Sequence, residues 1–294
     1  MILTYREAIR EGMSIRMRED PRVILFGEDT GAYGGSFGIT LGMYDEFGGD
    51  RVRDTPISES AIIGCAVGSA ATGMRPIAEL VFCDFLTVAM DQIANQAAKM
   101  RYMFGGKISL PMVVRMPAGA GQGGAAQHSQ SLEAWVTHVP GLKVVYPSTP
   151  QDALGLILSA IDDDNPVIYF ENKIIKEKAD ITNFDPIPLG KGNIVREGTD
   201  ISVITYGLQV YDAKKAADIL AKDGISLEII DLRTLYPLDK DMIRSSIAKT
   251  HHAIVITEET KRGGYGGEIS ATIAEEMFDE LDGPVVRIGS LHTP

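Results

Sequence analysis

The sequence predicts an α/β protein of two domains, each built on a parallel sheet with helices beside it. Short β-branched runs alternate with longer segments of helical periodicity, which is typical of parallel β-α units. The predicted strands are continuous apolar runs, as expected for strands covered on both faces. A polar segment at residues 173–198 interrupts the alternation. We therefore place the domain boundary near residue 185, which gives domains at residues 1–185 and 186–294.

The alternation can be followed element by element in both domains. In the first, we predict strands at Val23–Phe26, Pro76–Leu80, Met112–Arg115, Lys143–Tyr146 and Val167–Phe170, and helices at Thr4–Glu19, Ser58–Thr72, Leu86–Arg101 and Pro150–Ile161. Thr149 and Pro150 are typical of a helix start. In the second, we predict strands at Ile201–Thr205, Leu227–Asp231, Ala253–Thr257 and Val285–Ile288, and helices at Val210–Asp223, Lys240–Lys249 and Gly267–Asp279. The last strand stands close to the chain end, so we expect a truncated second domain.

Composition narrows the class of protein. The formal net charge is −12, which disfavours binding to nucleic acid and to anionic membranes. The most apolar stretch, Ala61–Met74, is too short to span a bilayer. The two cysteines, Cys65 and Cys83, have no CxxC spacing, so neither a disulfide framework nor a zinc site is indicated. We expect a cytoplasmic protein.

Glu59, in the run DTPISE, is the first candidate functional residue. It stands at the predicted start of a helix, where a carboxylate can simply complement the helix dipole. The alternative is functional. Beside Ile62 and Ile63, the carboxyl group could share a proton with a nitrogen of a bound ligand.

His128 follows a glycine-rich run that begins at Gly119, beyond a predicted strand. A single histidine is often structural. A histidine that follows a glycine-rich loop at the carboxyl end of a strand is also well placed for acid–base work, and the pattern alone leaves both interpretations open.

Two further segments have simpler explanations. The run Lys261–Gly267 lies between a strand and a helix, as an anion-binding loop would, but matches neither the dinucleotide fingerprint nor the Walker pattern. A tight turn is the favoured interpretation. The acidic residues at 160–166 precede a proline and are typical of a solvated turn. They could also offer oxygen atoms to a hard cation, although their spacing is not that of a calcium loop.

Several runs, taken together, resemble one family. They are GED at residues 27–29, RVRDTPISE, AMDQIANQAAKMRYMFGG, AAQHSQSLEAW, HVPGLKVVYPSTPQDA, DDNPVIYFE and DLRTLYPLD. They resemble, in order and spacing, the beta subunits of the thiamin-diphosphate-dependent first component of 2-oxo acid dehydrogenase complexes. The resemblance covers essentially the whole chain. It implies a thiamin pyrimidine-binding domain followed by a transketolase-like C-terminal domain.

The resemblance also implies roles for particular residues. Glu59 matches the glutamate that hydrogen-bonds the cofactor's aminopyrimidine ring, Ile57 a backbone carbonyl near its amino group, and Phe85 an aromatic ring packed beside it. His128 matches the active-site histidine. A potassium site built largely from backbone carbonyls is implied at Met112, Ala160, Ile161, Asp163 and Asn165.

One motif of thiamin enzymes is missing. The chain has no GDG and no NN pair, which would hold the diphosphate through Mg²⁺. The resemblance implies that an alpha subunit supplies them in an α2β2 heterotetramer that serves a lipoyl-bearing acyltransferase core. Acetoin, pyruvate and branched-chain 2-oxo acids are the possible substrates. NQAAKMRYMFGGK and the terminal HTP resemble acetoin dehydrogenase beta chains most. A non-catalytic scaffold and a self-sufficient transketolase-like enzyme are the alternatives from other classes.

Overall fold

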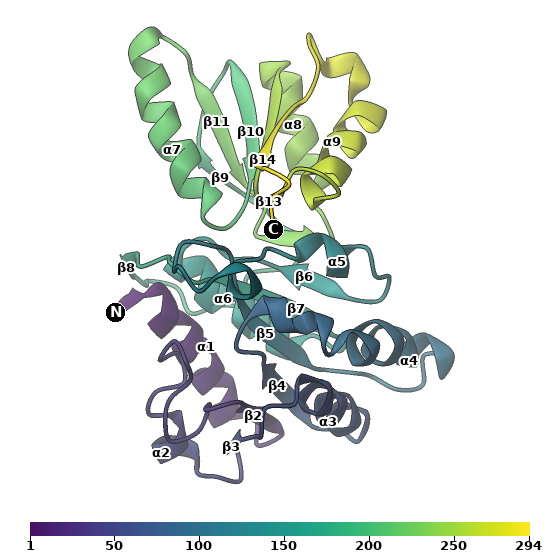
Figure 1. Ribbon diagram of the computed structural model, residues 1–294. Coiled ribbons are helices and arrows are strands. Elements are labelled where there is room, and N and C mark those ends of the chain that lie inside the picture. Colours follow the sequence, from purple (N-terminus) through teal and green to yellow (C-terminus); the bar gives the residue numbers. More distant parts are fainter. The chain divides into compact units, whose positions relative to one another are not determined.

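The computed structural model describes residues 1–294 of the chain without a gap. The chain folds into two compact units, Met1–Leu189 and Gly190–Pro294, and the boundary predicted near residue 185 lies beside this division. Each unit contains a mostly parallel sheet with helices packed beside it (Figure 1). The predicted α/β class is therefore confirmed. No helix is both long enough and apolar enough to cross a membrane.

The strands of the main sheet in Met1–Leu189 run parallel, so their carboxyl ends lie on the same side of the sheet. Its strands follow the order β6-β7-β5-β4-β2-β3, and all neighbours are parallel. An antiparallel pair joins β1 to β8. The strands are β1 (Ile2–Thr4), β2 (Val23–Gly27), β3 (Val52–Asp54), β4 (Arg75–Glu79), β5 (Val113–Ala118), β6 (Lys143–Val145), β7 (Val167–Asn172) and β8 (Lys178–Asp180). Segments that follow parallel strands leave the sheet at its carboxyl edge, where ligands commonly bind in open α/β sheets.

The helices of this unit begin with the expected chemistry. In α1, Thr4 and Glu7 form a reciprocal capping box. In α6, the Thr149 side chain accepts a hydrogen bond from the Asp152 amide, and Pro150 takes the first helical position. The helices are α1 (Tyr5–Glu19), α2 (Met43–Phe47), α3 (Glu59–Ala71), α4 (Ala98–Met103), α5 (Glu133–Thr137) and α6 (Pro150–Asp162), with 3-10 helices η1 (Cys83–Thr87) and η3 (Ala126–His128).

The single helix predicted at Leu86–Arg101 is wrong. The chain forms η1, then a π-helix η2 (Gln92–Ala97), and then α4. Ala97 and Ala98 are both buried, although they are consecutive. The wider π turn brings an additional residue to the covered side, which an i to i+4 pattern does not reveal.

The unit Gly190–Pro294 has the strand order β14-β13-β10-β11-β9, in which only β9 is antiparallel to its neighbour. The polar segment predicted as a linker, residues 173–198, is partly structured, because it contains the strands β8 and β9. The elements are β9 (Asn193–Arg196), β10 (Ile201–Thr205), α7 (Gln209–Leu220), η4 (Ala221–Asp223), β11 (Leu227–Asp231), β12 (Thr234–Tyr236), α8 (Lys240–Thr250), β13 (Ala253–Thr260), α9 (Tyr265–Glu276), η5 (Phe278–Glu280) and β14 (Val286–Ser290).

Candidate functional site

Glu59 is a buried carboxylate at the start of a helix. It follows β3 and opens the 13-residue helix α3. Only 8% of its surface is exposed, yet no side-chain hydrogen bond or ion pair within the chain involves it. The helix dipole favours a negative charge at this position. Ile57, two residues earlier, is 82% exposed, so the turn that precedes Glu59 is open to an approaching molecule.

Glu28 places a second carboxyl group near Glu59. It follows β2, the strand that pairs with β3. Burial raises the pKa of Glu28, and the charges of Glu59 and Asp29 raise it further. Carboxyl groups that disfavour each other's charge can share or pass a proton. The sequence analysis assigned no role to Glu28. The only feature that could have pointed to this residue is its position in the run GED.

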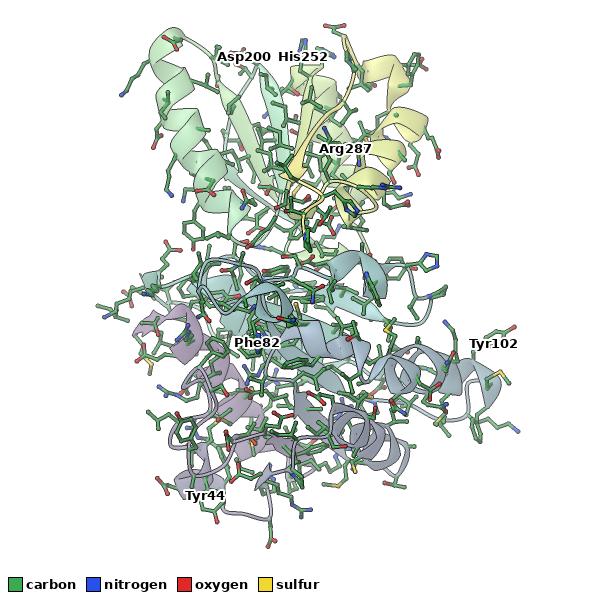
Figure 2. All side chains as sticks on the ribbon, viewed as in Figure 1. Tyr44, Phe82, Tyr102, Asp200, His252 and Arg287 are labelled. Carbon is green, nitrogen blue, oxygen red and sulfur yellow. The ribbon has the colours of Figure 1, made fainter.

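An aromatic cluster follows β4 and includes Phe85. The rings of Phe82 and Phe85 meet edge to face with centroids 6.0 Å apart, and Phe37 meets Phe82 in the same way at 5.6 Å. Figure 2 shows Phe82 within the body of Met1–Leu189. The Ser60 hydroxyl donates to the carbonyl of Val88 at 2.7 Å, so the first turn of α3 lies against the segment that carries this cluster.

His128 joins the cluster from the next strand. Its ring lies 4.6 Å from that of Phe82 and 5.6 Å from that of Phe85, both edge to face. Its Nδ1 atom is buried without a hydrogen-bond partner. A buried polar atom without a partner is costly, and at a functional site it marks a group available to a ligand.

The loop Gly119–Gln130, which we call the His128 loop, has an unusual backbone. The Gly119 amide donates to the carbonyl of Gln130 at 3.0 Å and closes the loop beyond β5. Three glycines in it have positive φ, namely Gly119, Gly121 and Gly123. Ala125 also has φ 64° and ψ −177°, a conformation that is strained for a residue with a side chain. Contacts outside the loop must therefore hold this geometry.

These residues converge from neighbouring strand ends. Glu28 follows β2, Glu59 follows β3, Phe85 follows β4 and His128 follows β5, and these strands are adjacent in the sheet. The structure brings the rings of Phe85 and His128 into contact. It holds the helix start that carries Glu59 beside the segment after η1.

A buried ion triad joins the same strands. Arg115 on β5 donates through Nη1 to both carboxylate oxygens of Glu171 on β7, at 2.6 and 2.8 Å, and through Nη2 to Glu79 on β4. Burial raises the pKa of Glu79 to about 7, against the attraction of Arg115. Two carboxylates around one guanidinium leave an excess negative charge in the interior, and protonation of Glu79 removes it.

Of the residues expected to form a potassium site, Ala160 and Ile161 lie in the last turn of α6, Asp163 and Asn165 follow that helix, and Met112 directly precedes β5. The carbonyls at the end of a helix favour a cation. Three protein cations already lie there: Arg101 donates through Nη1 to the Asn165 side-chain oxygen at 2.6 Å, and the others are Arg75 and Lys143. Arg75 Nη1 donates to the carbonyls of Ile161 and Asp163 at 2.8 and 3.3 Å, and Lys143 pairs with the Asp163 carboxylate. Burial acts to raise the pKa of Asp163, but Lys143 and Asn165 outweigh it and hold this pKa below its usual range. A carbonyl oxygen has two lone pairs, so these carbonyls retain capacity for an ion.

The glycine-rich run Lys261–Gly267 forms a tight connection between β13 and α9. Gly263 has φ 71°, and the Gly266 amide donates to the Glu259 carboxylate at 3.0 Å. An amide that an anion-binding loop would offer to a ligand is thus taken by a carboxylate of the same unit.

Comparison with known proteins first defines the class. Residues 2–176 match the family model described as the transketolase pyrimidine binding domain, and residues 190–294 match that of the transketolase C-terminal domain. A solved structure titled "Split gene transketolase, inactive beta4 tetramer" superimposes with a TM-score of 0.81 and covers 99% of this chain and 90% of that one. Its sequence identity is 20%, so this likeness concerns the fold alone.

Curated relatives then define the family. The chain is 48% identical to acetoin:2,6-dichlorophenolindophenol oxidoreductase subunit beta of Cupriavidus necator over 99% of this chain and 90% of the relative. It is 46% identical to 2-oxoisovalerate dehydrogenase subunit beta of Bacillus subtilis, over 100% and 90%. It is 43% identical to pyruvate dehydrogenase E1 component subunit beta of the same organism, over 99% and 90%. The chain belongs to this family of thiamin-diphosphate-dependent dehydrogenase E1 beta subunits.

Proposed function

We propose that this chain is the beta half of a thiamin-diphosphate-dependent dehydrogenase that cleaves acetoin or decarboxylates a 2-oxo acid, and that passes the remaining acyl unit to a lipoyl group. One observation carries the proposal. Glu59 is buried at a helix start without a hydrogen-bond or ion-pair partner in the chain, and the adjacent Ser60 bonds to Val88 in the segment that carries Phe82 and Phe85. A carboxylate in this state needs a ligand to satisfy it.

The residues present fit the aminopyrimidine part of the cofactor. Glu59 would hydrogen-bond a ring nitrogen, the exposed Ile57 would offer its carbonyl to the amino group, and Phe85 would pack beside the ring. When bound, the cofactor supplies a carbanion and an electron sink. Glu59 would hold the proton shared with the ring nitrogen, and Glu28 would tune that proton through its charge.

The remainder of the cofactor requires a second polypeptide. The chain has neither a GDG motif nor an NN pair, and no group of three acidic, histidine or cysteine side chains is arranged to hold a metal ion. We therefore assign the diphosphate and Mg²⁺ to an alpha subunit in an α2β2 heterotetramer. The lipoyl group would belong to an acyltransferase core.

His128 is assigned to the transfer step. A lipoyl ring that opens as the acyl group arrives needs a proton on its sulfur, and histidine can supply a proton near neutral pH. The orphaned Nδ1 and the exposed surroundings of the His128 loop leave the imidazole free for this exchange.

Acetoin is the substrate we propose. NQAAKMRYMFGGK and the terminal HTP resemble acetoin-type chains, and relatives of this type are 46–48% identical. The test is reduction of an artificial electron acceptor by the chain combined with its alpha subunit, with acetoin, pyruvate and 2-oxoisovalerate compared at equal concentration. We expect the highest kcat/KM with acetoin. A higher value with either 2-oxo acid would replace acetoin, and no thiamin-dependent reduction with any of them would contradict the proposed activity.

A further inference from the structure

Lys173 is a fully buried cation at the carboxyl end of the sheet that has no role so far. It directly follows β7, and its side chain is 0% exposed. An ammonium group is rarely placed in a protein interior unless several partners satisfy it. The partners of Lys173 therefore indicate what it does.

Those partners lie at both ends of the His128 loop. The Lys173 ammonium donates to the carbonyl of Gly119 at 2.8 Å and to that of His128 at 2.6 Å. It also lies 4.9 Å from the centroid of the Phe82 ring, the same ring that the His128 imidazole meets edge to face. One cation thus fixes the start of the loop, the histidine backbone and the aromatic ring against which the histidine packs.

Asp84 is the counter-charge of the Lys173 ammonium. Its carboxylate is buried in η1 and lies 3.8 Å from the Lys173 ammonium. Asp84 Oδ1 accepts from the amide of Gln130 at 3.2 Å and from its side-chain Nε2 at 2.9 Å. The ion pair therefore holds Gly119, His128 and Gln130 together.

We infer that Lys173, paired with Asp84, is a positioning residue that holds the His128 loop in its strained conformation and so fixes the imidazole beside Phe82 and Phe85. The backbone of Ala125 supports this inference, because its conformation needs such support. The catalytic consequence rests on the proposed function. The effect on the loop does not.

Two variants separate positioning from general stability. Lys173→Met removes the ammonium but leaves the Asp84 carboxylate buried without its counter-charge, which is strongly destabilising. The double variant Asp84→Asn, Lys173→Met removes both charges, while the amide oxygen introduced at position 84 can still accept from Gln130. The double variant therefore lacks chiefly the bonds to Gly119 and His128. Lys249→Met, which breaks an ion pair with the buried Glu228 in the other unit, is the matched control.

The readouts are taken on the chain alone, without cofactor or alpha subunit. We expect amide exchange within residues 119–130 to rise about tenfold or more in both Lys173 variants, as the loss of a charge-assisted hydrogen bond predicts. We expect the ring-current shift that Phe82 imposes on the His128 imidazole in NMR spectra to be lost. The double variant should recover the melting temperature that Lys173→Met loses, but not the loop protection. Lys249→Met should leave both loop signals unchanged.

Combined with the alpha subunit, the double variant should lose about 10²-fold in kcat, because misplacing a reacting group by about 1 Å has costs of this size. The inference would be overturned if the double variant kept wild-type loop protection and the wild-type His128 signal. It would also be overturned if Lys173→Met lost both and the double variant regained them together with its melting temperature. If the wild-type chain with its alpha subunit had no dehydrogenase activity while the variants still showed these loop changes, the proposed function alone would be contradicted.

Discussion

At the scale of single residues, Glu59 combines burial with the absence of a partner, and this combination separates its two interpretations. If it only complements the helix dipole, neutralising it costs about 0.3–1 kcal/mol of stability and little else. If it shares a proton with the cofactor, Glu59→Gln should lower kcat by about 10²–10⁴-fold at saturating cofactor, with a nearly unchanged melting temperature.

The matched control is Glu268→Gln, which removes a carboxylate from the first turn of α9. It should show the small stability effect without the loss of turnover. Near-normal turnover in Glu59→Gln would leave the dipole as the only role of this residue.

His128→Ala tests the transfer step. We expect it to impair production of NADH by the full complex more than reduction of an artificial acceptor, because the acceptor bypasses the lipoyl group. Equal losses in the two assays would place His128 before the transfer. If neither activity fell, the histidine would be structural.

The raised pKa of Glu79 predicts that the free energy of unfolding depends on pH. Its pKa is raised to about 7 by burial, whereas an unfolded glutamate titrates near 4.3. The folded state therefore binds the proton more tightly. The stability from this residue is complete below about pH 4 and is lost as the pH rises through about 7. We expect the urea midpoint of Met1–Leu189 to fall between pH 5 and pH 8, and this fall to be smaller in Glu79→Gln.

The single tryptophan, Trp135, lies in this unit and gives a fluorescence signal for its unfolding. Glu46→Gln, on the exposed surface, should keep the wild-type pH dependence. An equally steep decline in Glu79→Gln would assign the pH dependence to other groups.

At the scale of elements, sequence periodicity predicted the long pieces and missed the short or irregular ones. Helices α1 and α6 were found because their capping residues and apolar spacing are local signals, whereas α3, whose N-cap Ser58 makes no side-chain capping bond, was found from its long apolar run. The pair β1 and β8 was missed, because three-residue strands have no periodicity and their pairing joins Ile2 to Asp180 across the length of the unit. The π-helix η2 was missed because its apolar residues still recur at helical spacing.

Some residues of the candidate site could be predicted from the sequence and others could not. Glu59 and His128 stand in recognisable motifs, whereas Lys173 and Asp84 are ordinary residues in sequence. Their role depends on contacts with residues far along the chain, such as the bond from Lys173 to Gly119. Burial and pairing of this kind exist only after folding, so no local pattern could identify them.

The turn after α6 carries an element-scale prediction. If the carbonyls of Met112, Ala160, Ile161, Asp163 and Asn165 bind potassium, then K⁺ should stabilise Met1–Leu189 relative to choline at equal ionic strength. Mass action predicts about 2.7 kcal/mol at 100 times the dissociation constant. Thermal melting across ion identities measures this effect. An unchanged melting temperature would mean that Arg75, Lys143 and Arg101 supply the cations at this turn.

At the scale of the whole molecule, the proposed function assigns to the two transketolase-type units one part of an active site. The unit Met1–Leu189 presents a carboxylate, an aromatic cluster and a histidine at the carboxyl edge of its sheet, but the chain contains no diphosphate motif. The chain has two transketolase-type domains but no diphosphate motif, so the proposed function needs a second polypeptide.

The isolated chain should therefore show no thiamin-dependent turnover, and activity should appear when the alpha subunit is added. Titrating alpha into a fixed amount of this chain, with acceptor reduction as the signal, should give a break at one alpha per beta. Glu59→Gln should reach its own break at the same ratio with little activity, because the role proposed for Glu59 is in binding the cofactor and not in assembly. Robust turnover by the pure chain would show that it is self-sufficient, and complex formation without any activity would show that it is a scaffold.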